Sequence, residues 1–248
     1  MKNLGDLLTL CDAGTWGDED CNGLPLLRST NMQGGELILD DLKTISVPMD
    51  KVSHFLLREG DILMTKSSGS VDHIGKSLFI TGEMDGKYGF SNFTQRLRVN
   101  REVVLPRWVY LIVSSPATRD FFLWASQTTT GLRNLKISRL RELEIPLPSL
   151  PEQKKIVAKL EKVLGKIKEA KRLRAEAEAA ASTLLSAELR RIFQEGKQKG
   201  WEEIPLKDIS TIKTGGTPSK VNESFWDGSI PWISPKDMKS WIVRDAQD

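Results

Sequence analysis

Three short stretches of the sequence collect side chains of the types that can read DNA. Arginine and lysine pair with guanine, asparagine and glutamine pair with adenine, and serine, threonine and lysine contact phosphates. The candidate DNA-binding residues are Lys66, Ser67, Ser68, Lys76, Asn92, Gln95, Arg96, Thr128, Thr129, Thr130, Arg133, Asn134 and Lys136. A smaller fourth stretch holds Arg28, Ser29 and Asn31. Polar loops are solvated by default, so an ordinary surface loop is the competing interpretation of each stretch.

The third stretch, residues 127–136, is the strongest candidate. It contains no acidic residue and lies between apolar segments. A basic, acid-free loop suits a polyanion such as DNA.

Other chemistries lack the residues they need. Cys11 and Cys21 are the only cysteines, and His54 and His73 are the only histidines, without the close spacing of a structural zinc site. The glycine motifs of nucleotide-binding loops and the G-x-S-x-G motif of hydrolases are absent. The sequence therefore predicts no metal site, no cofactor and no enzymatic activity.

One short motif favours a nuclease as a weaker alternative. Asp85-Gly86-Lys87 has the acid-x-lysine spacing of metal-dependent nucleases. Because Asp-Gly is typical of hairpin turns, and no second acidic pair precedes it at an evident spacing, we favour a hairpin. The Asn/Asp-Pro-Pro-Tyr/Phe signature of adenine methyltransferases is also missing, so the chain is not expected to methylate DNA itself.

The elements that must position these residues form an α+β domain over residues 1–150. Strands are expected at residues 59–65, 76–80 and 95–99, where apolar residues follow turn residues. Short helices are expected at residues 106–113 and 116–126, which are rich in aromatic side chains.

Residues 151–199 form a different zone and predict one long helix. This zone begins with Pro151, which a first helical turn tolerates, and Gly196 supplies a stop. Apolar side chains recur every three or four residues, the spacing of a coiled coil. The stripe is formed by Ile156, Leu160, Val163, Ile167, Leu173, Leu184, Leu189 and Ile192.

This helix needs a partner. At 1.5 Å per residue, about 44 helical residues make a rod about 65 Å long, which is longer than a domain of this size is wide. The alternative is a helix that lies on its own domain. We favour an intermolecular coiled coil, in which the stripe forms the dimer interface.

The last zone, residues 200–248, repeats the first. Leu4-Gly5-Asp6-Leu7 matches Leu206-Lys207-Asp208-Ile209 at an offset of 202 residues. Leu24-Pro25-Leu26-Leu27, followed by Met32, matches Ile230-Pro231-Trp232-Ile233, followed by Met238, at an offset of 206. The chain is thus organised as one domain, one long helix, and the start of an incomplete second copy of that domain.

These segments resemble a known family. Residues 145–157, with the sequence IPLPSLPEQKKIV, resemble the start of the helical region in specificity subunits of type I restriction–modification enzymes. Residues 214–219 and 225–238 resemble the opening of a target recognition domain of that family. Residues 59–63 and 129–135 fit the body of such a domain, so the resemblance covers essentially the whole chain.

The resemblance implies a subunit that reads DNA and does not catalyse. In that family, two target recognition domains lie at opposite ends of an antiparallel helix pair, each reads half of a bipartite target, and methylation subunits clamp around them. The chain departs from this pattern because it holds one complete domain and one helix. The implied form is a truncated or half-length subunit, and its homodimer would read an inverted target and dock the methylation subunit and, through it, the restriction subunit. A coiled-coil scaffold that has lost DNA reading is the alternative.

Composition agrees with these expectations. With 36 basic and 33 acidic residues, the chain has a net charge of +3, which permits a nucleic-acid partner without requiring one. It has neither an apolar run long enough to span a membrane nor a signal peptide, so a cytoplasmic location is expected.

Overall fold

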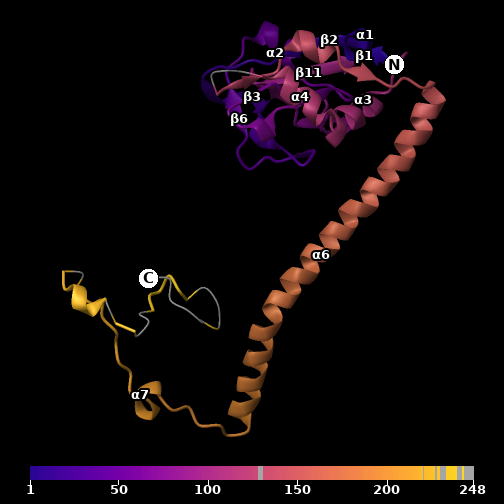
Figure 1. Ribbon diagram of the computed structural model, residues 1–248. Coiled ribbons are helices and arrows are strands. Elements are labelled where there is room, and N and C mark those ends of the chain that lie inside the picture. Colours follow the sequence, from indigo (N-terminus) through magenta and orange to yellow (C-terminus); the bar gives the residue numbers. More distant parts are fainter. Residues whose placement is uncertain (128–130, 220, 227, 230–232, 239–241, 243–248) are drawn as a thin grey trace. The chain divides into compact units, whose positions relative to one another are not determined.

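The computed structural model describes residues 1–127, 131–219, 221–226, 228–229, 233–238 and 242. The fold is α+β, with small sheets, short helices and one long helix, as the sequence predicts (Figure 1). The chain divides into two compact units, Met1–Glu176 and Ala177–Asp248.

A four-stranded antiparallel sheet organises the first unit. Its strand order is β2 (Leu8–Ala13), β11 (Thr94–Val99), β7 (Ile62–Thr65) and β9 (Ser77–Phe79). β7, β9 and β11 confirm the three predicted strands. Every residue of β7 is buried, because the strand lies inside the sheet with side chains packed on both faces.

Smaller sheets complete the first unit. β3 (Glu19–Leu27) lies between β10 (Gly89–Phe90) and β6 (Lys43–Ile45). Three pairs of two-residue strands are β1 (Lys2–Asn3) with β13 (Glu144–Ile145), β4 (Met32–Gln33) with β5 (Glu36–Leu37), and β8 (Ser67–Ser68) with β12 (Arg133–Asn134).

Five short helices belong to the first unit: α1 (Leu4–Leu7), α2 (Met49–Phe55), α3 (Pro106–Val113), α4 (Arg119–Ala125) and α5 (Ile137–Arg141). Short 3-10 turns lie at Ser29–Asn31, Val71–His73, Gly82–Met84 and Pro116–Thr118. The helices predicted at residues 106–113 and 116–126 are α3 and the Pro116–Thr118 turn with α4. Helix α3 begins at Pro106 and buries Trp108, whose Nε1 donates a hydrogen bond to the Pro146 carbonyl at 2.8 Å.

The Asp85-Gly86 hairpin prediction is wrong. Gly86 is in a left-handed turn with a φ of 66°, but the strands before and after it do not pair with each other. β9 pairs with β7, and β10 pairs with β3. Asp85 instead accepts a hydrogen bond from the Glu59 backbone N–H at 2.9 Å, which ties this turn to the turn before β7.

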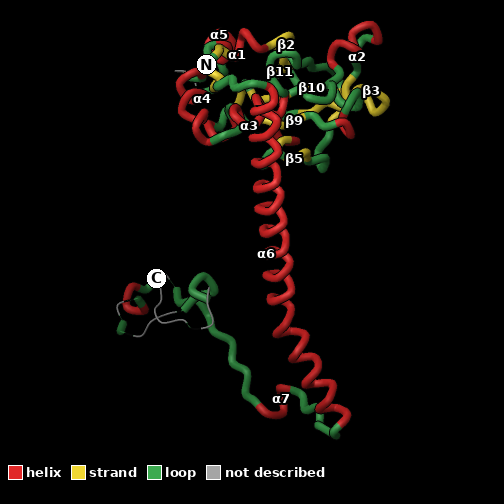
Figure 2. The backbone as a smooth tube through the Cα atoms, turned by 90° about the vertical axis from the view of Figure 1, so that its right-hand side faces the viewer, coloured by secondary structure: helices red, strands yellow, loops and turns green. Residues whose placement is uncertain are grey.

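Helix α6 (Leu150–Gln198) confirms the predicted long helix. At its start, the Ser149 backbone N–H and hydroxyl both donate to Glu152, at 3.0 and 2.7 Å, and these bonds lower the pKa of the Glu152 carboxyl. Gln153 is fully buried and accepts from the Leu105 N–H at 2.9 Å, which fixes the first turn of α6 to the domain. Figure 2 shows α3, β9 and β5 beside the first part of this helix.

The helix does not stop at Gly196. It continues to Gln198, and Gly200 takes the left-handed conformation after its end, with a φ of 85°. Gly196 serves a different purpose, because the ring of Trp201 occupies the space where a Cβ at residue 196 would lie.

The repeat also appears in the local structure of the second unit. Helix α7 (Leu206–Ile209) has the same four-residue length as α1, at the offset of 202. At the offset of 206, the Ser234 N–H donates to Asp237 Oδ2 at 2.8 Å, as the Arg28 N–H donates to Asn31 Oδ1 at 3.0 Å. Ile230, Pro231 and Trp232 of the sequence repeat lie outside the described residues. In α1 the leucines are fully buried, whereas Leu206 and Ile209 of α7 are exposed.

Candidate nucleic-acid interface

A short antiparallel strand pair brings together two of the polar stretches. β8 carries Ser67 and Ser68, and β12 carries Arg133 and Asn134. Ser68 pairs with Arg133, and Ser67 with Asn134. Two loops more than sixty residues apart in sequence thus form one surface element.

Hydrogen bonds on both sides hold this strand pair in place. Ser67 Oγ donates to Asn134 Oδ1 at 2.7 Å, and the Leu135 N–H donates to the Lys66 carbonyl at 2.7 Å. Leu135 is buried in the core, whereas Asn134 and Lys136 on either side of it are exposed. The core residue therefore anchors the strand, and its polar neighbours face solvent.

The second polar stretch lies against the first. The Phe93 carbonyl accepts from the N–H groups of both Lys66 and Ser67, at 3.0 and 3.1 Å. The Asn92 N–H donates to the Thr15 carbonyl at 3.0 Å. Residues 66–68, 92–93 and 133–136 form one connected group of loops, which we call the polar loop surface.

Two aromatic residues beside the polar loop surface were missed by the sequence reasoning. Phe93 is 51% exposed although its backbone is fixed, and Trp16, next to Thr15, is 76% exposed. Exposed aromatic rings offer apolar contact with bases or with the thymine methyl group. The sequence signal for both is an aromatic residue inside a polar loop, which polar composition alone does not mark.

Gln95 and Arg96 are wrong predictions for a DNA contact. Both are buried in β11, and Gln95 Nε2 donates to Cys11 Sγ at 3.4 Å. Arg96 donates to both carboxylate oxygens of Asp12, at 2.9 and 2.6 Å, and its guanidinium lies on the ring of Phe90. Their donors are used inside the domain, so neither side chain is available to DNA.

The fourth stretch is also structural. Asn31 is buried and donates through Nδ2 to the Ile38 carbonyl at 2.8 Å. Arg28 pairs with Asp41 at 2.6 Å. These bonds stabilise the turn before β4, and the buried Asn31 side chain is used inside the domain.

Lys76 and the threonines at positions 128–130 are the predicted DNA-contact residues that remain to be placed. Lys76 immediately precedes β9, and its carbonyl accepts from the Thr65 N–H at 2.8 Å, one residue from Lys66. Thr128, Thr129 and Thr130 lie outside the described residues. Within the part of the chain that the structure describes, no group of three His, Cys, Asp or Glu residues is placed to hold a metal ion.

Comparison with known proteins identifies the family. A family model described as "Type I restriction modification DNA specificity domain" matches residues 1–179. The chain is 22% identical over 143 residues to the type I restriction enzyme EcoKI specificity subunit of Escherichia coli strain K12, which is 58% of this chain and 31% of the relative. It is 27% identical over 150 residues to the EcoBI specificity subunit of Escherichia coli, which is 60% of this chain and 30% of the relative. The chain thus matches about a third of the length of these curated relatives.

Solved structures agree in fold. The HsdS subunit of Thermoanaerobacter tengcongensis aligns over 75% of this chain and 47% of its own, with a TM-score of 0.53 and 20% identity. A structure that describes complex assembly and conformational transition of the type I R-M system aligns over 88% of this chain and 56% of its own, with a TM-score of 0.61 and 20% identity. Members of the matched family are specificity subunits rather than enzymes. The chain belongs to the type I restriction–modification DNA specificity family.

Proposed function

We propose that the chain is a DNA sequence-specificity subunit that reads its target through the polar loop surface. The observation that carries this proposal is the β8–β12 pair, which joins two of the predicted stretches into one element. Asn134 of this pair and Lys136 just after it are exposed on either side of the buried Leu135, and Arg133 is half-buried. Arginine and asparagine are the residue types that discriminate guanine and adenine in a major groove.

The partners follow from the family. We propose that the chain binds double-stranded DNA, docks the methylation subunit and, through it, the restriction subunit. Those partners supply catalysis and S-adenosylmethionine. The site of action is the cytoplasm, and no membrane takes part. Among the described residues, no helix combines the length and the apolar character needed to cross a bilayer.

The apolar stripe of α6 supports a homodimer. All eight predicted interface residues are substantially exposed, from Ile192 at 38% to Leu184 at 67%. No second long helix lies within the described residues to cover them. A stripe of this kind is buried when another helix packs against it.

The spacing of the stripe suits an antiparallel pair of identical helices. Ile156 and Ile192, at the two ends of the stripe, lie 18 positions before and after residue 174. In an antiparallel pair with a two-fold axis at residue 174, each of these residues packs beside its counterpart in the second copy. The two ends of the stripe therefore meet in that register.

A symmetric dimer determines the form of the target. We propose that residues 1–150 are a target recognition domain, that residues 151–199 are the dimerisation helix, and that residues 200–248 correspond to the start of a second recognition domain. Two likenesses support the last assignment. Helix α7 matches α1, and the hydrogen bond from Ser234 to Asp237 matches the one from Arg28 to Asn31. Two copies related by a two-fold axis would read a bipartite, palindromic sequence.

The competing function is a coiled-coil scaffold without DNA reading. The experiment replaces Arg133 and Lys136 by alanine and measures binding to duplex DNA, with the methylation subunit present, at several salt concentrations. A matched control replaces Lys51 and Lys87, two exposed lysines in α2 and the 82–88 turn region. Weaker binding and a shallower salt dependence only in the first variant support recognition, whereas equal behaviour of the two variants supports the scaffold.

A further inference from the structure

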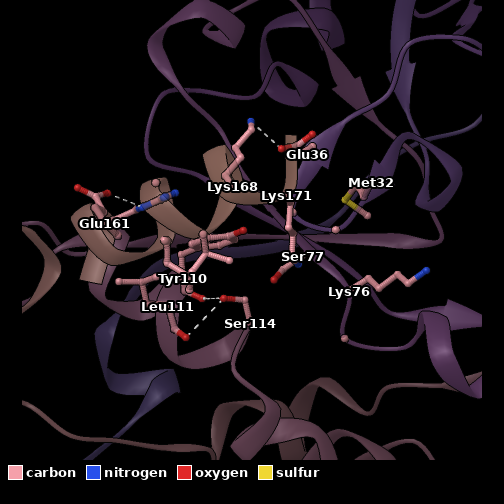
Figure 3. Close-up of a pocket in the computed structure, with 17 residues that line it drawn as sticks. Met32, Glu36, Lys76, Ser77, Tyr110, Leu111, Ser114, Glu161, Lys168 and Lys171 are labelled. Atoms are coloured by element: carbon pink, nitrogen blue, oxygen red, sulfur yellow. Dashed lines mark hydrogen bonds and ion pairs between the residues drawn. The ribbon is translucent and has the colours of Figure 1, made fainter. Parts of the chain in front are cut away.

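The first unit also contains a hollow that none of the residues of the β8–β12 pair lines. It is a cleft of about 990 Å³ between the β4–β5 turn, the start of β9, α3 and the first half of α6 (Figure 3). Its apolar lining includes Met32, Leu111 and Leu164. On the α6 side, there is open space beside Gly165, because a Cβ at this position would meet no atom within 4 Å.

The charged lining of the cleft is predominantly basic. Arg107 pairs with Glu161 at 2.8 Å, and Lys168 pairs with Glu36 at 2.6 Å, as Figure 3 shows. Two further lysines, Lys76 and Lys171, also line the cleft. Among the described residues, no carboxylate lies within ion-pair distance of either of these two. The cleft therefore carries two positive charges that its own acids do not balance.

A buried hydroxyl in the same cleft lacks a partner. Ser77 lines the cleft and is only 7% exposed, and its Oγ makes no hydrogen bond within the structure. Buried hydroxyl groups are nearly always hydrogen-bonded, so an isolated one indicates an external partner. That partner must accept a hydrogen bond or donate one in a cleft whose lining includes Lys76 and Lys171.

We propose that this cleft binds a phosphate group. Phosphate oxygens accept hydrogen bonds from lysine ammonium groups and from serine hydroxyls. Ser77 would donate a hydrogen bond to the phosphate, and Lys76, directly before β9, and Lys171, on α6, would supply positive charge from the lining of the cleft. The residual positive charge favours an anion over a neutral ligand.

The position of Lys76 points to DNA as the source of the phosphate. Its carbonyl accepts from Thr65, directly before Lys66, so the cleft adjoins the polar loop surface. In this form the inference rests on the proposed function, and the phosphate belongs to the duplex backbone beside the bases that are read. A free phosphate compound is the other source of the same chemistry.

The experiment combines Lys76→Ala with Lys171→Ala and compares the result with Lys51→Ala plus Lys87→Ala. Binding to the selected duplex is measured against salt concentration in the presence of the methylation subunit. Loss of two phosphate contacts should lower the slope of log K against log salt by about two. Sequence preference should stay unchanged, because phosphate contacts carry no base information.

A second arm tests the free ligand. The melting temperature of the full chain is measured with inorganic phosphate and, separately, with ATP, for the wild type and for Gly165→Glu. This variant places a carboxylate in the cleft at a position where a side chain has room, so it should fold and should lose any phosphate-dependent stabilisation.

The outcomes separate the possibilities. A lowered salt slope supports a DNA phosphate, and stabilisation that Gly165→Glu abolishes supports a free phosphate compound. An unchanged slope together with no stabilisation overturns the cleft proposal. If the wild type still enriches a DNA sequence in that case, the proposed function stands without the cleft. If it enriches none, the proposed function fails independently.

Discussion

Ser67 Oγ donates a hydrogen bond of 2.7 Å to the side-chain oxygen of Asn134, a residue 67 positions further along the chain. The bond fixes the orientation of an exposed amide on the β8–β12 pair. An asparagine held in this way offers its Nδ2 donor in a defined direction. Base discrimination depends on such geometry, because a misdirected amide cannot pair with the adenine edge.

Replacement of Asn134 by alanine should weaken binding to the selected target by about 1–3 kcal/mol, the range expected for one specific base contact. Binding to unrelated duplex DNA should change little, because phosphate contacts are retained. Fluorescence anisotropy at fixed salt, with both DNAs, measures the difference. Asn22→Ala, at an exposed position of β3, is the matched control.

Ser67→Ala should reduce the same discrimination to a smaller extent, since it releases the amide without removing it. Equal losses on specific and unrelated DNA after Asn134→Ala would contradict a base-reading role for this residue.

Arg96→Met should destabilise the fold rather than act on DNA. The change leaves Asp12 without its two hydrogen bonds and also removes a donor from the Leu56 carbonyl, which Arg96 contacts at 3.0 Å. Removal of one partner of a buried ion pair costs about 3–5 kcal/mol. Urea unfolding of the full chain measures this loss.

The control for Arg96 is Arg58→Met. Arg58 lies 4.0 Å from Asp85 in an exposed pair, so its loss should cost about 1 kcal/mol or less. If the Arg96→Met chain folds with normal stability but binds DNA less well, the result would indicate that Arg96 contacts DNA.

Ile167→Glu should weaken the α6 dimer, because it places a charge in the apolar stripe. Sedimentation velocity at micromolar concentration should show the wild type at twice the chain mass and the variant shifted toward the monomer. Lys166→Gln lowers the net charge by the same amount one residue outside the stripe and should leave the dimer intact. A wild-type monomer at this concentration would refute the dimer.

The register has its own test in a chain with Cys11 and Cys21 replaced by serine. Ile156→Cys combined with Ile192→Cys should form a disulfide between two copies, while Ile156→Cys alone should not. Cross-linking by the single variant would indicate parallel helices.

Local sequence patterns predicted the regular elements well. The strands at 62–65 and 77–79, α3, and the long helix follow from apolar periodicity and proline position. The Asp85-Gly86 turn was found, but its strands were misassigned, because strand partners are chosen by long-range packing rather than by the turn.

The candidate site was predicted only in part, for the same physical reason. Polar composition marked residues 66–68 and 133–136 as separate candidates, but the β8–β12 pairing that joins them is a tertiary event that no local pattern shows. Glutamine and arginine usually lie on the protein surface, so residue type alone predicts that Gln95 and Arg96 are exposed. Their burial depends on Cys11 and Asp12, which lie on the neighbouring strand β2 and more than eighty residues away in sequence.

The most direct test of the central claim is selection from a random duplex library. The full chain and the methylation subunit are incubated with the library, and bound DNA is recovered and sequenced over several rounds. We predict enrichment of a two-part sequence whose second half is the inverted complement of the first, separated by a spacer of fixed length. Enrichment of no sequence, with DNA bound at equal strength regardless of its bases, would contradict the claim that this chain specifies a DNA target.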